Sequence, residues 1–339
     1  MLRVYRLGSL WSNGLSNELA THRAACDSGY GPTDTVTVMR TEGDTWDICN
    51  GVGSTAALVA AIRAMAGRGP EPLVVDPYAE IFARAASPEW ADLLDGKVTE
   101  HALLDPSFGS ACQLYHAART RYFDDYCAKA MAAGVRQIVI LAAGLDARAH
   151  RLPWPDGTTV YELDRLPVLE FKRRTLAANG DKPRADRREV PVDLREDWPK
   201  TLREHGFDPS KPTAWLVEGL LVYLPVAAVD RLFEDIELAS APGSRVAIEE
   251  IDQLPDQSLT EPADEPDSVI RFRKEWLGLT YNEQRSDAAK WFATRGWNTE
   301  SVTLLDYLDS MDREAKVISE NPQQTPAYVT LTTAVLRPS

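Results

Sequence analysis

Residues 137–146 read QIVILAAGLD, and this stretch decides the fold. Its first six residues form a short apolar run rich in β-branched side chains, which is typical of a strand buried on both faces. A turn of small residues around Gly144 follows. A second strand is predicted over 159–163 and ends at Asp164, 20 residues after that glycine. This order is the outline of a nucleotide-binding α/β unit, in which the acid accepts hydrogen bonds from ribose hydroxyls.

The composition excludes several classes of protein. The 339 residues carry a net charge of −14, with 44% hydrophobic and 26% charged residues, so a globular chain without a nucleic-acid partner is expected. No apolar run approaches the roughly 18 residues that a membrane helix needs. The four cysteines form no CxxC pair and the five histidines lack metal-ligand spacing, so we expect no metal site and a reducing cytoplasm.

The N-terminal part of the chain divides into two regions. Residues 1–38 contain scattered glycines and no hydrophobic period, so a poorly ordered leader is expected, and Met39 is a second candidate start of translation. Residues 39–134 have helical patterns and are predicted to form a helical cap near the mouth of the sheet. Its helices are expected from the N-cap Ser54, from Pro77 and over 112–133.

Residues 135–339 are predicted to form an α/β domain. Apolar segments alternate with helical patterns, and the last segment alternates in polarity like an antiparallel strand of a mixed sheet. Residues 252–283 are acidic and contain prolines, so we expect an insertion over the site. Six strands are expected, over 137–142, 159–163, 188–192, 214–217, 245–251 and 328–335.

The ends of four predicted strands carry an acid or a glycine, at Gly144, Asp164, Asp193 and Glu218. In an open parallel sheet, ligands bind beyond the carboxyl ends of the strands, so these positions should converge on one ligand. Taken singly, an acid at a strand end is more often a helix cap, and Asp193 or Glu218 alone would be read that way. The prediction of a common ligand site rests on the spacing of all four residues at successive strand ends.

Each strand end has a role if the ligand is S-adenosylmethionine. The small residues Ala143 and Gly144 let the backbone approach the methionine part. Asp164 accepts from both ribose hydroxyls. The Asp193 carboxylate accepts from the adenine amino group, and the Leu194 backbone N–H donates to the ring.

The helix predicted over 112–133 supplies an arginine for the methionine carboxylate, either Arg119 or Arg121. On their own, both would be expected to be solvated or paired with Asp124 and Asp125. His116 and two cysteines of this helix do not share one face, and we assign them structural roles.

Four segments carry a family resemblance, and they occur in the order 118–125, 137–151, 160–164 and 217–224. The chain resembles the actinobacterial S-adenosylmethionine-dependent methyltransferases that are related to leucine carboxyl methyltransferases. The resemblance covers roughly Met39 to the C-terminus. It implies a class I methyltransferase fold of the Rossmann-like α/β type, a mixed seven-stranded sheet with helices on both faces and an N-terminal helical cap.

The resemblance also implies the cofactor S-adenosyl-L-methionine and a role for each site residue. Arg119 would bind the carboxylate of the cofactor, and Gly144 would form the loop beside it. Asp164 would bind the ribose, and Asp193 with Leu194 would bind the adenine. Glu218 would lie near the methionine end. The chain departs from the family pattern at Ala142, where a glycine is usual, and at Ala147, where a threonine is usual.

The sequence thus predicts a methyltransferase that acts on a hydroxyl or carboxylate oxygen of an unidentified acceptor, either a small molecule or another carboxylate, and it leaves the oligomeric state open. A carboxylate acceptor needs no general base, and no His- or Lys-based constellation is recognisable. Two alternatives stay open. An NAD(P)-dependent oxidoreductase shares the strand–loop–acid outline but normally has three loop glycines, and a non-catalytic protein can keep the fold without the reaction.

Overall fold

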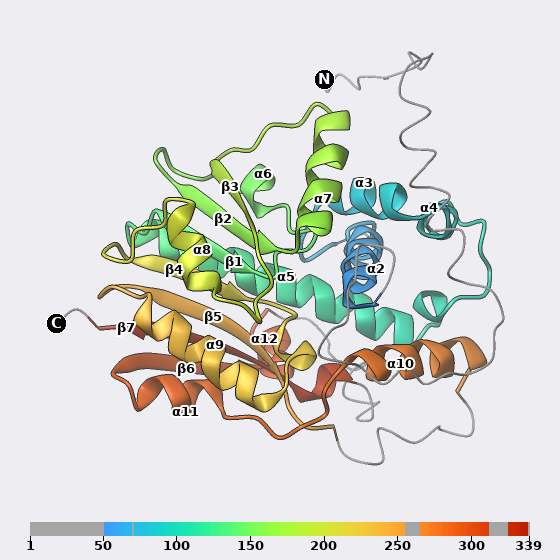
Figure 1. Cartoon of the computed structure of the whole chain (residues 1–339). Helices are drawn as coiled ribbons and strands as arrows, with labels where there is room; N and C mark the ends of the chain where they lie inside the picture. Colours follow the sequence, from blue (N-terminus) through green and yellow to red (C-terminus); the bar gives the residue numbers. More distant parts are fainter. Residues whose placement is uncertain (1–50, 70, 255–264, 312–324, 338–339) are drawn as a thin grey trace. The chain divides into compact units, whose positions relative to one another are not determined.

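The computed structural model describes residues 51–69, 71–254, 265–311 and 325–337 (Figure 1). The predicted leader and the alternative start at Met39 lie outside these ranges. No helix of the described chain is long and apolar enough to cross a membrane.

A seven-stranded sheet with the strand order β3-β2-β1-β4-β5-β7-β6 forms the centre of the fold (Figure 1). The first five strands of this order run parallel, whereas β7 is antiparallel to both β5 and β6. The strand order reverses between β1 and β4, which places the switch point of the sheet beside the loop after β1. The strands are β1 Gln137–Leu141, β2 Thr159–Asp164, β3 Asp186–Pro191, β4 Thr213–Val217, β5 Arg245–Ile251, β6 Trp297–Thr303 and β7 Val329–Leu336.

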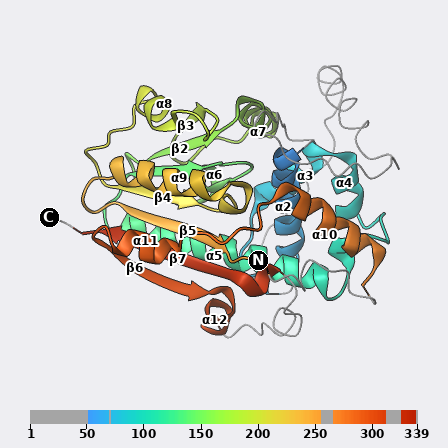
Figure 2. The ribbon, with the colours of Figure 1, turned by 60° about the horizontal axis from the view of Figure 1, so that its bottom comes forward.

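Helices cover both faces of the sheet, as predicted (Figure 2). Val139 and Leu141 pack with α8, α9 and α11, whereas Ile138 and Ile140 point to the other side and pack with α5 and α12. This alternation within one apolar strand is expected of a strand buried on both faces. The helices around the sheet are α5 Phe108–Ala132, α6 Arg148–Arg151, α7 Leu166–Ala178, α8 Trp198–Glu204, α9 Val226–Leu238, α11 Ala288–Ala293 and α12 Leu304–Asp309. Two 3-10 turns, η2 Leu221–Tyr223 and η4 Thr325–Tyr328, lie in the loops.

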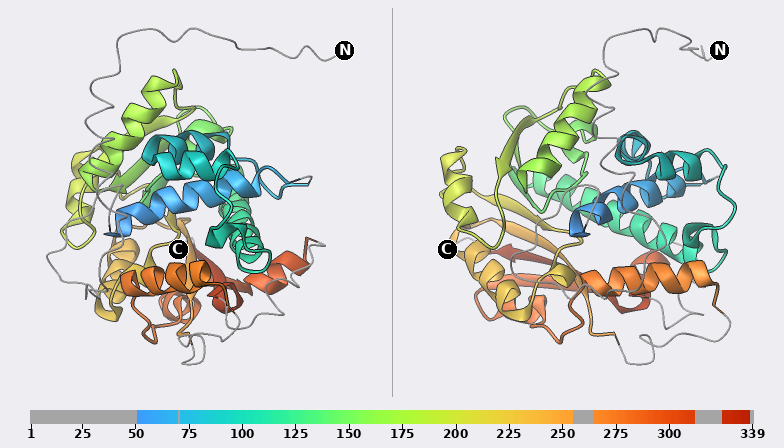
Figure 3. Two further views of the ribbon diagram at one scale, coloured as in Figure 1. Left: turned by 90° about the vertical axis from the view of Figure 1, so that its right-hand side faces the viewer. Right: turned by 45° about the vertical axis from the view of Figure 1, so that its right-hand side comes forward.

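The helices of the cap lie side by side (Figure 3), and they pack through small residues. Alanines of α2 face alanines of α3 around the buried ring of Phe82, and the same cluster includes Leu145 of the loop after β1 and Leu176 of α7. Short side chains allow α2 and α3 to approach each other closely, and the cap packs directly against the loop that follows β1. These elements are α2 Gly51–Ala66, α3 Pro77–Ala86, α4 Pro88–Leu94 and η1 Ala102–Leu104, and α10 Asp267–Leu279 lies against η1.

Two predicted helix starts need correction, and one strand was not predicted. Ser54 is not an N-cap, because α2 already includes Gly51 and the Ser54 hydroxyl donates to the Gly51 carbonyl at 2.8 Å. The long helix α5 begins at Phe108, four residues before the predicted start. Strand β6 was not predicted, because this edge strand is mostly polar and buries only Trp297.

The predicted boundary at residue 134 between cap and sheet domain stays a prediction. Helix α5 contributes to both, since it contacts α2 of the cap and also covers β1 of the sheet. The predicted insertion over 252–283 likewise stays a prediction; its described part contains α10, and residues 255–264 lie outside the described ranges.

Glu250 of β5 offers a test of how the helices are fastened to the sheet. Its carboxylate accepts from the Ala288 N–H at 2.9 Å and from the Thr332 hydroxyl at 3.0 Å, which joins β5 to α11 and β7. Burial raises the pKa of Glu250 to about 7, although these two hydrogen bonds oppose the shift.

The folded protein therefore binds this proton more tightly than the unfolded chain, and the stabilisation is lost as pH rises through about 7. We expect the free energy of unfolding to fall by about 2–3 kcal/mol between pH 5 and 8 relative to Glu250→Gln. The amide keeps an acceptor for Ala288 and carries no charge. Urea unfolding of both proteins at the two pH values measures this, and parallel pH dependences would show that Glu250 titrates normally.

Candidate functional site

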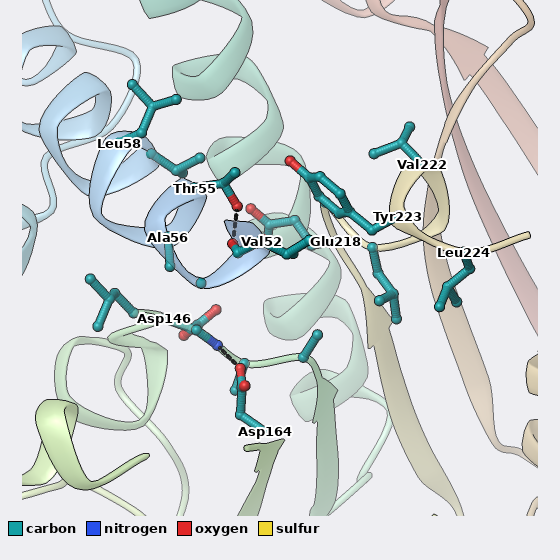
Figure 4. A pocket seen from close by; sticks show the side chains of 18 of the residues that line it. Val52, Thr55, Ala56, Leu58, Asp146, Asp164, Glu218, Val222, Tyr223 and Leu224 are labelled. Carbon is teal, nitrogen blue, oxygen red and sulfur yellow. Dashed lines mark hydrogen bonds between the residues drawn. The ribbon is translucent and has the colours of Figure 1, made fainter. Parts of the chain in front are cut away.

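A cavity of about 740 Å³ opens at the carboxyl ends of the parallel strands (Figure 4). Its volume lies within the roughly 300–1,000 Å³ that is usual for small-molecule sites. All predicted site residues line it, namely Arg119, Ala143, Gly144, Asp164, Asp193, Leu194 and Glu218. The structure thus brings the seven residues together, while their individual roles remain predictions.

Asp164 lies at the end of β2, at the foot of the cavity (Figure 4). One carboxylate oxygen accepts from the Gly144 N–H at 2.7 Å, and the other accepts from the Arg165 N–H at 2.7 Å. Burial raises the pKa of Asp164, and the two backbone hydrogen bonds partly offset that rise. Each oxygen has more than one lone pair, so both retain capacity for a hydroxyl donor.

The loop after β1 adopts left-handed backbone conformations at two positions. Gly144 has φ +44°, and a Cβ atom there would come within 3.3 Å of the Ala56 side chain in α2. Gly144 is thus required both by its conformation and by the seating of the cap. Ala142 has φ 50° and is the one non-glycine residue of the described chain with a positive φ. The family's usual glycine at this position fits that conformation without strain.

Asp193 follows β3, and its carboxylate already has a partner. It accepts from Arg195 three times, from the backbone N–H at 3.0 Å, from Nε at 2.9 Å and from Nη2 at 2.6 Å. Burial opposes the charged form, but these hydrogen bonds prevail and the pKa of Asp193 is lowered. The side chain therefore shapes the turn after β3 as well as lining the cavity.

Of the two arginines considered for the methionine carboxylate, only Arg119 lines the cavity. Arg121 is exposed and pairs with Asp125 at 3.0 Å, as its helical spacing predicts. The Arg119 guanidinium contacts Glu218 at 3.1 Å and Glu249 at 3.2 Å. Its hydrogen bonds to described residues are all made by Nη1, and Nη2 makes none with them, so one donor edge is available.

A second buried arginine fixes Glu218 from the opposite side. Arg148 is 1% exposed and contacts Glu218 at 2.7 Å and Asp124 at 2.8 Å, and it also pairs with Asp146. Burial alone would raise the pKa of Asp146, but the charge of Arg148 is the largest opposing effect and lowers it to about 2.

Glu249 was missed by the sequence analysis, although it completes the site. It lies within β5, accepts from the Tyr115 hydroxyl and from the Gly219 N–H at 2.6 Å, and is 3% exposed. The available signal was the pair of glutamates, Glu249 and Glu250, that follows the apolar run of this strand. Glu218 lines the cavity between Arg119 and Arg148, and Glu249 holds Arg119 without lining the cavity. This end of the cavity therefore combines carboxylates with guanidiniums and suits a ligand that carries both an anionic and a cationic group.

Comparison with known proteins identifies the family. Residues 56–237 match the family described as leucine carboxyl methyltransferase. A protein of Mycobacterium tuberculosis named "Putative S-adenosyl-L-methionine-dependent methyltransferase" is 51% identical over 278 residues, which cover 81% of this chain and 92% of the relative. This chain belongs to the leucine carboxyl methyltransferase family. A protein of Mycobacteroides abscessus with the same name is 52% identical over 278 residues, with the same coverage of both chains.

Solved structures are more distant. A methyltransferase from Thermobifida fusca is 16% identical, with a TM-score of 0.45 over 85% of this chain and 99% of that one. The mitomycin 7-O-methyltransferase is 18% identical, with a TM-score of 0.37 over 78% of this chain and 74% of that one. The family match and the sheet order together confirm the predicted fold class and family.

The strained loop residue generates a prediction. Ala142→Gly should raise the free energy of unfolding by about 1 kcal/mol, because glycine adopts the left-handed conformation without cost. Ala143→Gly is the matched control, since Ala143 has a negative φ, and it should lower stability by about 0.5–1 kcal/mol. Denaturant unfolding measures both, and changes of the same sign in the two variants would contradict the assigned backbone strain.

Proposed function

We propose that this protein transfers a methyl group to an oxygen, a hydroxyl or a carboxylate, of a small-molecule acceptor. The cofactor is S-adenosyl-L-methionine. The observation that supports the proposal most strongly is the convergence of Arg119, Gly144, Asp164 and Asp193 on one cavity, in a chain of the leucine carboxyl methyltransferase family.

The side chains present fit this cofactor. Its two ribose hydroxyls need an acceptor, and the Asp164 oxygens retain lone pairs beside the Gly144 N–H. Its carboxylate needs a donor, and Nη2 of Arg119 is available. Its ammonium and sulfonium groups are cations, and the carboxylate of Glu218 lines the same end of the cavity as Arg119. A ligand with these three groups therefore complements the cavity.

The bound cofactor supplies an electrophilic methyl group, so the protein contributes mainly alignment and exclusion of water. Arg119 binds the carboxylate and is held in place by Glu218 and Glu249. Asp164 orients the ribose. The loop around Gly144 brings the backbone close to the methionine part. Asp193 and Leu194 bind the adenine.

The two alternative functions predict different ligands. An oxidoreductase would bind a nicotinamide dinucleotide at the same Asp164, and a non-catalytic protein would bind the cofactor without forming product. The loop after β1 holds one glycine, which favours the methyltransferase. We further propose a cytoplasmic location, from the cysteine usage, and no nucleic-acid partner, from the acidic composition.

Titration calorimetry tests this function. The protein should bind S-adenosylhomocysteine and give no measurable heat with NAD or NADP. Asp164→Ala should weaken binding about 10- to 100-fold, or about 1.4–2.7 kcal/mol, because charge-assisted bonds to the ribose are lost. Glu204→Ala on the exposed face of α8 removes the same charge far from the cavity and should leave affinity unchanged.

Circular dichroism of both variants controls for folding, since Asp164 also accepts two backbone hydrogen bonds. Binding of NAD without binding of S-adenosylhomocysteine would refute the methyltransferase proposal.

A further inference from the structure

Helix α5 presents one face to the cavity along three turns. The residues that line it recur every three or four positions, with Tyr115 and His116 adjacent, which is the repeat of one helix face: Phe108, Cys112, Tyr115, His116 and Arg119. His116 therefore lies one turn before Arg119, between the charged cofactor end and the apolar start of the helix.

Beyond His116 the cavity has apolar, largely aromatic walls, which we call the apolar chamber. Helix α2 forms one wall, and α10 and η2 form the other. The rings of Phe108 and Phe272 meet edge to face with their centroids 5.3 Å apart. The residues of the chamber are Leu58, Val59, Ile62, Phe108, Cys112, Val222, Tyr223, Phe272, Trp276 and Tyr281. Flat aromatic ligands pack well against such walls.

The cations beside the apolar chamber already have anionic partners. Arg63 lies 3.6 Å from Asp76, and Arg273 pairs with Glu265. Each of these two cations is thus neutralised by one carboxylate, although Nε of Arg63 and Nη1 of Arg273 make no hydrogen bond with the described residues. A charged carboxylate that entered the chamber would be desolvated without a net positive charge from this pair of cations to offset the cost. The chamber therefore favours an uncharged acceptor.

His116 lines the cavity next to this chamber and carries an acceptor atom. Its Nδ1 lies 2.8 Å from the Cys112 carbonyl oxygen, so Nδ1 bears the hydrogen and Nε2 keeps a lone pair. Nε2 makes no hydrogen bond within the described part of the chain, and His116 lines the cavity. Burial, and next the charge of Arg119, hold the pKa of His116 well below its ordinary value, so the ring stays neutral.

The neighbouring groups cannot serve as acceptors of a proton in the same way. The Tyr115 hydroxyl donates to Glu249, and burial raises its pKa well above the usual range. Burial also raises the pKa of Tyr223, whose hydroxyl interacts with Thr55 and Trp276, so it remains a donor. Figure 4 shows Tyr223 and Thr55 on facing walls of the cavity.

We propose that the apolar chamber binds an uncharged aromatic molecule with a phenolic hydroxyl, and that Nε2 of His116 accepts the hydrogen bond and then the proton of that hydroxyl. This rests on the proposed methyltransferase function and narrows its acceptor to a phenol.

The step balances as follows. The phenolic oxygen forms the new O–CH₃ bond with a lone pair, while the S–CH₃ bond breaks and sulfur keeps the bonding electrons. The O–H bond breaks and its proton passes to Nε2, so the positive charge moves from sulfonium to imidazolium. Methylation makes the oxygen strongly acidic, so even a weakly basic imidazole takes the proton as the methyl group arrives. The imidazolium releases this proton to water after the product leaves.

The test uses the full chain with radiolabelled S-adenosylmethionine and two probes that share the naphthalene ring, 2-naphthol and 2-naphthoate. Label should pass to 2-naphthol and not to 2-naphthoate. His116→Ala and His116→Phe should lower kcat by about 100-fold or more, as expected for loss of a general base, with unchanged affinity for S-adenosylhomocysteine. Added imidazole should restore part of the rate to His116→Ala but not to His116→Phe, whose ring fills the space.

Arg121→Gln, on the exposed face of the same helix, is the control and should retain full activity. Methylation of 2-naphthoate alone, of neither probe, or equal rates in the His116 variants would overturn the phenol proposal while leaving the methyltransferase function intact, provided that S-adenosylhomocysteine binds. Failure to bind S-adenosylhomocysteine would instead refute the proposed function itself.

Discussion

The position of Glu218 between two buried guanidiniums is the constraint on which the site depends. Arg119 comes from α5, Arg148 from the short helix after β1, and Glu218 from the end of β4. Buried charges are costly unless they are paired, and removing one partner of a buried pair costs about 3–5 kcal/mol. The three elements must therefore keep fixed positions relative to one another, and these positions determine the shape of the cavity around Glu218.

This arrangement prepares the protein for its ligand before binding. Glu249 and Glu218 hold the Arg119 guanidinium, and the Gly219 N–H is fixed by the same Glu249 carboxylate. A helix is stiff, so α5 also keeps His116 at a set distance from Arg119. The cofactor end and the apolar chamber are thus placed relative to each other by one element, which is what alignment of an acceptor requires.

The sequence predicted the parallel strands and their polar ends well, because strands buried on both faces are continuous apolar runs and their carboxyl ends meet at one edge. It failed where that signal is absent. Strand β6 is polar because it lies at the sheet edge. Glu249 lies inside a strand rather than after it. The sequence also did not show that His116 lines the cavity, since helical spacing alone cannot tell which face borders a cavity that α2 and α10 close from distant parts of the chain.

A crystal structure of the complex with S-adenosylhomocysteine tests the central claim most directly. The account predicts both ribose hydroxyls within hydrogen-bond distance of the Asp164 carboxylate and the homocysteine carboxylate against Nη2 of Arg119. It also predicts that Arg119 keeps its contacts with Glu218 and Glu249. A ligand that leaves Arg119 untouched, or that binds only after these ion pairs break, would contradict a site built around the buried Glu218.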